Sequence, residues 1–224
     1  MTIATAFLLS QQDAYADKTK LLLPFNGDML DVYGHTFESV GSPALVSNDN
    51  PYGAGGCVDF PGGGNRRCSH SDFATGTGEY TWEGWIKPLA GSGPYGRILE
   101  TASYPNEGGI SIVLIPGNPA YMMLQQGYRV YNSVAVSSAT AVPNGVWTYF
   151  RAGLGASALR LQLGDASAVV SGFSSICSAI TYNLAIGSNW YGGESLVAKL
   201  SNLRFTPGVW RGNEPMPTEP LPIP

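Results

Sequence analysis

Charged residues are scarce in this sequence of 224 residues. Only 12% of them are Asp, Glu, Lys or Arg, and the 12 Lys and Arg residues leave a net charge of −4. Globular proteins usually contain about 25% charged residues. The basic residues are scattered, so they form no stripe that could neutralise a row of phosphates. This composition argues against nucleic acid as a partner.

Long hydrophobic runs are also absent. No segment approaches the roughly 18 continuous apolar residues of a membrane-spanning helix, so membrane insertion is not expected. Residues 1–16 (MTIATAFLLSQQDAYA) contain a short apolar run and end in Ala-Tyr-Ala, which resembles a signal-peptide cleavage site. The run has no basic residue before it, and polar residues 10–13 interrupt it. A short N-terminal arm is therefore the favoured interpretation, with a signal peptide as the alternative.

Cysteine is limited to three positions, Cys57, Cys68 and Cys177. The first two flank a glycine cluster, and a hairpin turning at Gly62-Gly63 would place them opposite each other. Both a disulfide and two neighbouring thiols fit this spacing. Cys177 is interpreted as an ordinary buried thiol.

Histidine is rarer still, with only His35 and His70. Neither belongs to a pair with the spacing of metal ligands. No glycine-rich stretch joins a strand to a helix, so a phosphate-binding loop is not expected either.

Turn-forming residues, by contrast, are abundant. The chain contains 29 Gly and 16 Pro, while its hydrophobic content is 44%. It is too apolar for a disordered chain and too rich in turn formers for a helical bundle. Many short strands joined by tight loops, as in an antiparallel β-sandwich, fit this composition.

Alternating hydrophobicity supports the same fold class. In residues 79–87 (EYTWEGWIK), Tyr80, Trp82 and Ile86 share one face, and similar segments recur along the chain. Trp82, Trp85 and Trp147 lie in such segments and are predicted to belong to the core. We predict an N-terminal arm over residues 1–19, one sandwich over residues 20–206, and a tail over residues 207–224. The tail contains six prolines and is expected to run extended over the surface or out to a partner.

Seven segments occur in the order and at about the spacing of the laminin-G-like branch of the concanavalin A-like superfamily, which this chain resembles. The subtype it most resembles occurs in bacteriophage structural proteins. This resemblance implies an all-β antiparallel jelly-roll sandwich with loops gathered at its rim. It also implies surface recognition, often of glycans, or attachment within a virion. The matching segments are LLLPFNGD (21–28), GGCVDFPGGGNR (55–66), FATGTGEYTWEGWIKP (73–88), GVWTYFRAGL (145–154), ALRLQLGD (158–165), LAIGSN (184–189) and AKLSNLRFTPGVWRG (198–212).

Glucanases share this fold, so a hydrolase must be considered. They carry two catalytic Glu residues around a helper Asp on one strand, in the spacing Glu-x-Asp-x-Glu. Here Glu79 and Glu83 match the outer positions, but Thr81 replaces the Asp. Without that Asp, the charge arrangement that separates the two Glu pKa values is missing. We therefore predict that Glu83 has a structural role and that the protein is not an enzyme.

The resemblance also implies a calcium ion, because members of the superfamily often bind Ca²⁺ between the end of the first strand and the penultimate segment. The matching positions are Asn26, Asp28, Ser201 and Asn202. Three of these are neutral where the family commonly has acids, which would lower the affinity for a hard cation.

Loop aromatics suggest a carbohydrate site, since sugar rings stack on aromatic faces and bind amide and carboxylate groups. The segment Asn189-Trp190-Tyr191 is the most site-like, because two aromatics follow an amide in a polar, glycine-containing loop. Tyr104 and Tyr128 are further candidate ligand-binding residues. Alternatively, these aromatics cover the sandwich edge or contact another subunit.

We therefore predict a non-enzymatic lectin-like module on a virion surface, in a tail, fibre or head appendage, that recognises cell-surface carbohydrate. The alternative is a purely structural decoration or assembly protein that binds neighbouring virion subunits, and a glycoside hydrolase is the least favoured hypothesis. In either of the first two cases the chain is expected to be oligomeric or part of an assembly. If it is not viral, an extracellular location is expected.

Overall fold

A computed structural model describes residues 13–53, 55–74, 78–90, 95–101, 109–115, 120–128, 132–171 and 183–222. These residues form fifteen strands and one 3-10 helix, η1 (Ser71–Phe73). No helix in this part of the chain is long and apolar enough to cross a membrane.

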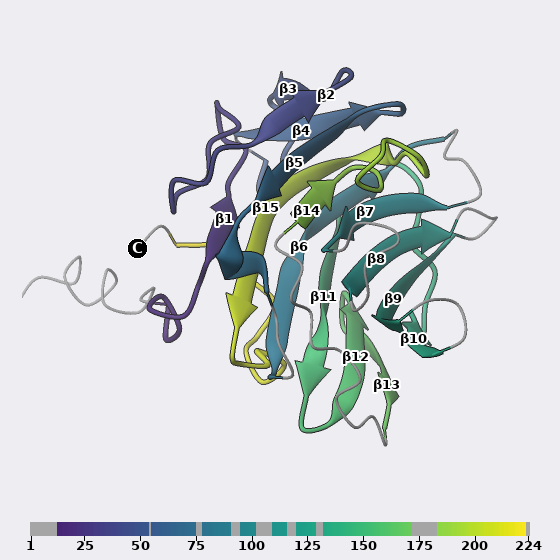
Figure 1. The fold of residues 1–224 in the computed structure, drawn as a ribbon. Helices are drawn as coiled ribbons and strands as arrows, with labels where there is room; N and C mark the ends of the chain where they lie inside the picture. The colour runs from purple at the N-terminus through teal and green to yellow at the C-terminus, as the bar shows by residue number, and fades with distance from the viewer. Residues whose placement is uncertain are drawn as a thin grey trace, which may run out of the picture.

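The strands form two antiparallel sheets that face each other (Figure 1). The eight-stranded sheet has the order β13-β12-β11-β6-β15-β4-β3, and β1 also pairs with β15. Its strands are β1 (Leu21–Leu23), β3 (Ala44–Ser47), β4 (Gly56–Pro61), β6 (Tyr80–Pro88), β11 (Thr148–Gly155), β12 (Ala158–Leu163), β13 (Ala166–Val170) and β15 (Val197–Pro207).

The seven-stranded sheet has the order β10-β9-β8-β7-β14-β5-β2. Its strands are β2 (Glu38–Val40), β5 (Asn65–Ser69), β7 (Gly96–Glu100), β8 (Gly109–Ile115), β9 (Tyr121–Tyr128), β10 (Asn132–Ser137) and β14 (Asn183–Ile186). The fold confirms the expected all-β jelly-roll sandwich.

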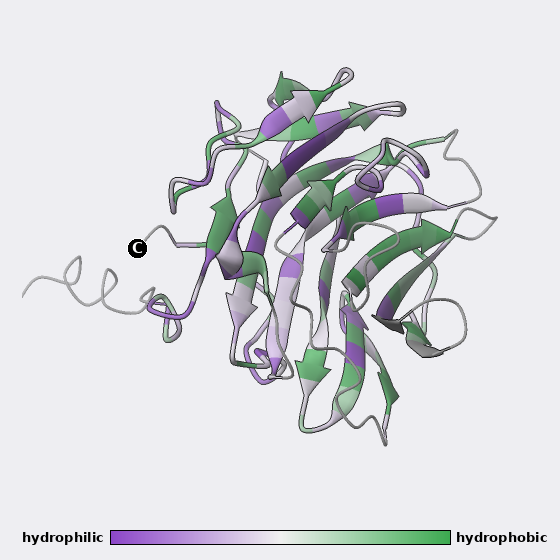
Figure 2. Ribbon diagram, viewed as in Figure 1, coloured by the Kyte–Doolittle hydropathy of each residue, from purple (hydrophilic) through white to green (hydrophobic). Residues whose placement is uncertain are grey.

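Apolar side chains fill the space between the sheets, because successive residues of a strand point to opposite faces. On β6, Tyr80, Trp82 and Ile86 are fully buried. Trp82 stacks on Phe205 of the neighbouring strand β15, with 4.2 Å between ring centroids. Figure 2 shows the resulting alternation of hydrophobic and hydrophilic residues along β15.

An irregularity in β15 changes which residues face the core. Ala198 and Leu200 point inward before it, Leu203 and Phe205 after it, and the pairing with β6 shifts between Ser201 and Arg204. Asn202, with φ +52°, is the extra residue, and Asn tolerates this left-handed conformation better than most residues. The bulge places Arg204 on the outer face, the side turned away from the other sheet, opposite Glu83 of β6.

The predicted hairpin at Gly62-Gly63 is wrong. β4 pairs with β3 and β15 in one sheet, while β5 pairs with β2 and β14 in the other. The glycine-rich turn therefore crosses between the sheets, and Cys57 and Cys68 do not face each other across a ladder. Both are buried free thiols, and burial raises the pKa of Cys57 to about 11.

The described part of the arm and the tail pack on the outer face of the eight-stranded sheet. The tail returns along this sheet, Leu221 is buried, and its N–H donates to Oδ1 of Asn202 (3.2 Å). The last described residues of the tail consequently lie close to β1 (Figure 1). Of the two courses expected for the tail, it follows the one over the protein's own surface.

Candidate functional site

The loop that follows β14 contains the predicted residues Asn189, Trp190 and Tyr191. Asn189 organises this loop from within: its Oδ1 accepts the backbone N–H groups of Tyr191 (3.1 Å) and Gly193 (2.7 Å). Its own backbone N–H donates to the carbonyl of Gly193 (2.9 Å). An Asn that bonds to the backbone two residues onward is a common way to fix a turn. Asn189 therefore shapes the loop that presents the two aromatics.

The two aromatic residues differ in exposure. Tyr191 is 67% exposed. Trp190 is partly buried, because the guanidinium of Arg67 lies over its ring at 5.5 Å from the centroid, a favourable cation–π contact. The backbone N–H of Trp190 also donates to the carboxylate of Glu100. The loop is thus held from the sheet side while one aromatic faces solvent.

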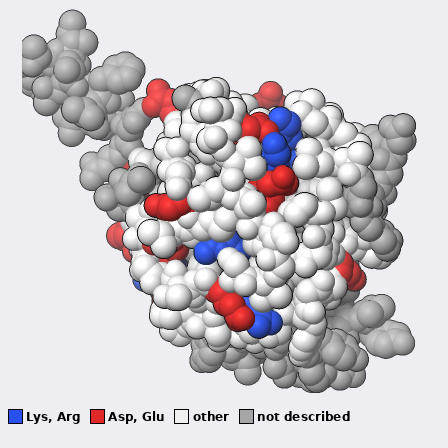
Figure 3. Space-filling view, turned by 90° about the horizontal axis from the view of Figure 1, so that it is seen from above, with Lys and Arg blue, Asp and Glu red and all other residues white. Residues whose placement is uncertain are grey.

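Charged groups of both signs surround this loop. Arg67 pairs with Glu38 at 2.9 Å, and Arg97 pairs with Glu100 at 2.7 Å and also with Glu194 of the loop. Burial raises the pKa of Glu100 despite the opposing effect of Arg97. In the view from above, charged atoms occur in small groups of mixed sign on a largely uncharged surface (Figure 3). Carboxylate and guanidinium groups beside an aromatic ring can hydrogen-bond to sugar hydroxyls.

The other two predicted ligand-binding residues are not brought into this arrangement. Tyr104 lies outside the described residues, and Tyr128 ends β9, where only the backbone is described. Their roles stay predictions. The structure therefore brings together only Asn189, Trp190 and Tyr191 of the five.

A second aromatic surface, missed from the sequence, lies on the outer face of the eight-stranded sheet. Trp85 and Trp147 are only partly buried there, so their predicted core position is wrong, whereas that of Trp82 is confirmed. Nε1 of Trp85 donates to the hydroxyl of Tyr52 (2.6 Å), and Nε1 of Trp147 donates to Asp49 (2.9 Å). Strict alternation could have shown this, because the odd positions 83 and 85 face away from Trp82.

Asp49 is the polar centre of this surface. Its carboxylate binds Nζ of Lys199 (2.6 Å) and Nζ of Lys87 (3.0 Å) as well as Trp147. Although partial burial opposes ionisation, these three donors lower the pKa of Asp49 to about 2. The carboxylate of Asp49 thus forms its hydrogen bonds and ion pairs with residues of its own chain.

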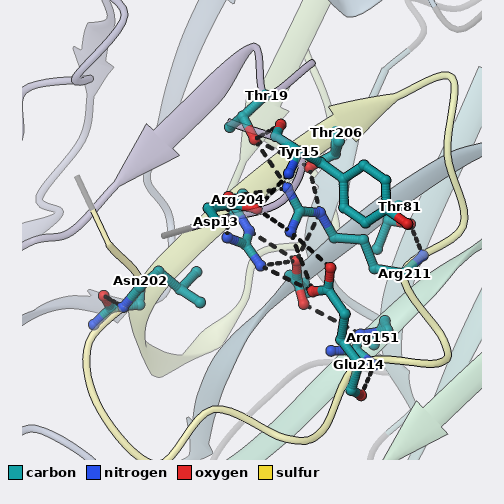
Figure 4. Close-up of polar contacts among 12 residues, drawn as sticks. Asp13, Tyr15, Thr19, Thr81, Arg151, Asn202, Arg204, Thr206, Arg211 and Glu214 are labelled. Atoms are coloured by element: carbon teal, nitrogen blue, oxygen red, sulfur yellow. Dashed lines mark hydrogen bonds and ion pairs between the residues drawn. The ribbon is translucent and has the colours of Figure 1, made fainter. Parts of the chain in front are cut away.

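A buried network of charged side chains, among them Asp13, Arg204 and Arg211, joins the sheet, the arm and the tail (Figure 4). Glu83 is part of this network. Its Oε1 lies 2.6 Å from Nη2 of Arg204, and its Oε2 accepts from Nε of Arg151 (3.2 Å) and from the hydroxyl of Tyr149. Arg211 of the tail lies 3.7 Å away. The Glu83 side chain is fully buried, yet its pKa is lowered because these cations outweigh the desolvation.

Arm and tail complete the network. Arg211 makes a two-pronged contact with Asp13 of the arm, at 2.7 and 3.0 Å, and also reaches Glu214 at 3.2 Å. Arg204 binds the same Asp13 at 2.7 Å. Three guanidinium groups thus face three carboxylates, so the charges balance within a buried region.

Thr81 has a role that explains its place between the two glutamates. Its Oγ1 donates to the carbonyl of Val209 (2.8 Å) and accepts the N–H of Arg211 (2.9 Å). Position 81 therefore anchors the backbone of the tail. Glu79, at the matching outer position, is exposed, and its Oε1 accepts the N–H of Ala156 (2.7 Å). Glu83 is buried beneath the tail, whereas Glu79 is exposed, so the two carboxylates do not open onto one surface.

The four residues suggested for calcium do not fit that ion in this arrangement. Ser201 and Asn202 are buried; Oγ of Ser201 accepts from Asn50 (3.3 Å), and Oδ1 of Asn202 accepts from Leu221 (3.2 Å). Asn26 and Asp28 are exposed, and Oδ1 of Asp28 accepts the N–H of Leu30 (3.0 Å). Calcium needs six to eight free oxygens around one point. Calcium binding stays a prediction without geometric support. It can be tested by adding calcium to the protein and measuring whether the melting temperature rises.

His35 and His70, which seemed isolated in the sequence, lie side by side. Their ligand atoms and that of Asp72 fall within 4.8 Å of one another. Only the short spacings Asp31-x3-His35 and His70-x-Asp72 could have indicated this, and neither shows that the two segments meet.

Comparisons with known proteins agree on the fold. No family model matches the sequence, and no curated protein does. Among solved structures, it is similar to domain 4 of AbnA, an extracellular GH43 arabinanase from Geobacillus stearothermophilus, solved in complex with arabinotriose. The TM-score is 0.65 at 18% identity, over 85% of this chain and 93% of that one.

Two further structures are larger than this chain. A botulinum neurotoxin type C structure, described as depending on two ganglioside molecules for cell entry, gives a TM-score of 0.66 at 9% identity, over 88% of this chain and 49% of that one. Tailspike protein 2 of an Escherichia coli O157:H7 bacteriophage gives a TM-score of 0.62 at 15% identity. The match covers 80% of this chain and 26% of the tailspike. This chain spans about half of the toxin structure and about a quarter of the tailspike. At these identities the similarity establishes the fold alone, an antiparallel β-sandwich.

Proposed function

We propose that this chain is a non-enzymatic carbohydrate-binding module of a virion surface protein, and that the loop of Asn189, Trp190 and Tyr191 contacts the sugar. One observation carries the proposal: two adjacent aromatics stand on a loop that Asn189 holds in shape. A loop fixed before binding loses little conformational entropy when it binds. The arabinotriose complex of AbnA domain 4 and the gangliosides of the toxin support the ligand class.

A non-enzymatic role is supported by the state of Glu83. Glycosidases need two carboxyl groups that reach the substrate, one of them protonated. Here arginines enclose Glu83 and lower its pKa, while Glu79 is exposed.

The alternative, a purely structural virion component, requires segments that reach a neighbour. The described arm and tail are instead bound to this chain's own sheet, with Asp13 and Arg211 each less than a tenth exposed. This arrangement favours carbohydrate recognition over attachment to a neighbouring virion subunit through the arm or the tail. The order of the sequence segments and the fold of the tailspike support a place in a virion.

Binding should be measured first on a glycan array and on whole cells, then as affinity for the best glycan. We expect Trp190→Ala and Tyr191→Ala each to weaken binding about tenfold or more, as truncation of a central aromatic does at other interfaces. Trp147→Ala is the matched control, because Trp147 is also partly buried but lies on the other sheet. Full affinity in both loop variants, or a loss only in Trp147→Ala, would place the site elsewhere.

The virion location needs a separate test. Antibody raised against the chain should label intact purified particles, and mass spectrometry should find the chain in them. Its absence from particles would refute the virion placement while leaving the glycan assay to decide the carbohydrate proposal.

A further inference from the structure

Two loops bring the chain's only two histidines together. His35 lies in the loop after β1, while His70 and Asp72 belong to the turn that begins η1 after β5. The two imidazole rings meet edge to face, 4.5 Å apart between centroids. We call Asp31, His35, His70 and Asp72 the histidine cluster.

Asp31 fixes the position of His35. Its Oδ1 accepts the N–H of Leu22 in β1 (2.8 Å), and its Oδ2 accepts the backbone N–H of His35 (3.2 Å). The same Oδ2 lies 2.6 Å from Nδ1 of His35, and both side chains are almost fully buried. When Nδ1 donates to this carboxylate, the lone pair of a neutral imidazole lies on Nε2.

The other nitrogen of His35 faces a second carboxylate. Nε2 lies 3.3 Å from Oδ2 of Asp72. Nδ1 of His70 lies 3.6 Å from the same oxygen and accepts the backbone N–H of Asp72 (3.3 Å). In that tautomer, His35 Nε2 and Asp72 Oδ2 both carry lone pairs, and the exposed ring of His70 lies beside them. A proton or a metal ion between Nε2 and Oδ2 would remove the repulsion of these lone pairs.

We propose that the histidine cluster binds a first-row divalent transition ion such as Zn²⁺, with His35 Nε2, a nitrogen of His70 and Asp72 Oδ2 as ligands and water completing the shell. Ligand atoms of a tetrahedral zinc lie about 3.3 Å apart at bond lengths of about 2.0–2.1 Å. The distances of 3.3 and 3.6 Å to Asp72 Oδ2 already approach this. The His70 side chain, 48% exposed, can turn to bring its nitrogen closer.

The surroundings of the cluster suit a metal. Asp31 holds the remote nitrogen of His35, as a carboxylate commonly does for a zinc-bound histidine. The ring of buried Phe73 packs on His35, 4.9 Å away between centroids, and an apolar neighbour limits the access of water. Imidazole and carboxylate together favour transition ions over calcium.

An ion here would join the two sheets. Asp31 and His35 are tied to β1 of the eight-stranded sheet, while His70 and Asp72 follow β5 of the seven-stranded sheet. Because the ion would bind only the folded chain, it would stabilise the fold. The site is separate from the proposed sugar loop: Ser69 pairs with Asn183 at the start of β14, whereas the loop follows the end of that strand.

The test uses the full chain after removal of metals with a chelator. Calorimetric titration with Zn²⁺ should show one equivalent bound, and saturation should raise the melting temperature. His70→Ala and Asp72→Asn should each weaken zinc binding by at least about tenfold. Asp165→Asn is the matched control, because Asp165 is exposed in the turn between β12 and β13, and it should bind zinc like the parent. Co²⁺ should give tetrahedral spectra without sulfur charge-transfer bands.

Three results would overturn the proposal. The parent chain could take up no zinc, zinc affinity could be unchanged in both His70→Ala and Asp72→Asn, or cobalt could show thiolate bands that disappear in Cys68→Ser. If the parent chain takes up no zinc, nitrogen-15 NMR should find His35 protonated on both nitrogens. A proton rather than a metal would then lie between His35 and Asp72.

Discussion

At position 83, one buried carboxylate faces cations from two strands and from the tail. Glu83 contacts Arg151 and Arg204 in the sheet, with Arg211 next to them. Such a group adds little net stability compared with an apolar replacement of the whole cluster, but removing one partner leaves the others buried and unpaired. Single substitutions should therefore be costly here.

We expect Glu83→Gln to lower the free energy of unfolding by about 3–5 kcal/mol, the usual cost of breaking a buried ion pair. The amide keeps the shape but cannot balance the guanidinium charges. Denaturant unfolding at neutral pH measures this change. Glu79→Gln, in the exposed glutamate of the same strand region, should change stability by no more than about 0.5 kcal/mol. Equal losses in the two variants would show that the buried charges are not the cause.

Asp49 should contribute stability that acid removes. Its folded pKa of about 2 lies below the ordinary value of 3.8, so the contribution is complete above about pH 4 and is lost as the pH falls toward 2. At pH 7, Asp49→Asn should cost about 1–2 kcal/mol, since the group is partly screened by solvent. The difference from the parent chain should shrink on lowering the pH. A constant difference between pH 7 and pH 2 would contradict the lowered pKa.

At the scale of strands, hydrophobic alternation predicted most of the sandwich. The segments of β6, β11 and β12 alternate strictly and end at turn residues, so their sequences predict strands. β2 and β3 were not, since these short edge strands bury little and show no clear period. The glycine turn at 62–64 misled because a tight turn looks the same in sequence whether it joins partners in one sheet or crosses to the other.

Gly155 of β11 leaves the space in which Trp210 of the tail packs on the sheet. A Cβ atom built on Gly155 would lie about 2.5 Å from Cβ and Cγ of Trp210, so any side chain there displaces this residue. Gly155→Ala should therefore loosen the tail, expose Leu221, and speed amide exchange and proteolysis after residue 207, with a loss of about 1–3 kcal/mol. Gly78→Ala, where a Cβ meets nothing within 4 Å, is the control. An unchanged exchange pattern in Gly155→Ala would argue against this contact.

For the molecule as a whole, the described parts of the arm and the tail meet over one sheet. Asp13 binds Arg204 and Arg211, which follow it by 191 and 198 residues. Local sequence patterns carry no information about such a contact, so the sequence does not predict that the arm and the tail meet. The meeting of His35 with His70 was hidden for the same reason. Alternation within single strands predicted the sandwich, and Thr81 in place of an Asp argued against a catalytic Glu83, because both patterns lie within one strand. The arginines that bind Glu83 come from other elements and could not be predicted in this way.

Arm and tail should consequently be coupled energetically. Asp13 and Glu214 both bind Arg211, so either one can partly balance it when the other is lost. We expect the double variant Asp13→Asn, Glu214→Gln to lose more stability than the two single variants combined, by about 0.5–3 kcal/mol. Asp13→Asn combined with Asp49→Asn, whose networks share no residue, should be additive within about 0.5 kcal/mol. Additivity in the first cycle, measured by denaturant unfolding, would mean that arm and tail bind the sheet independently.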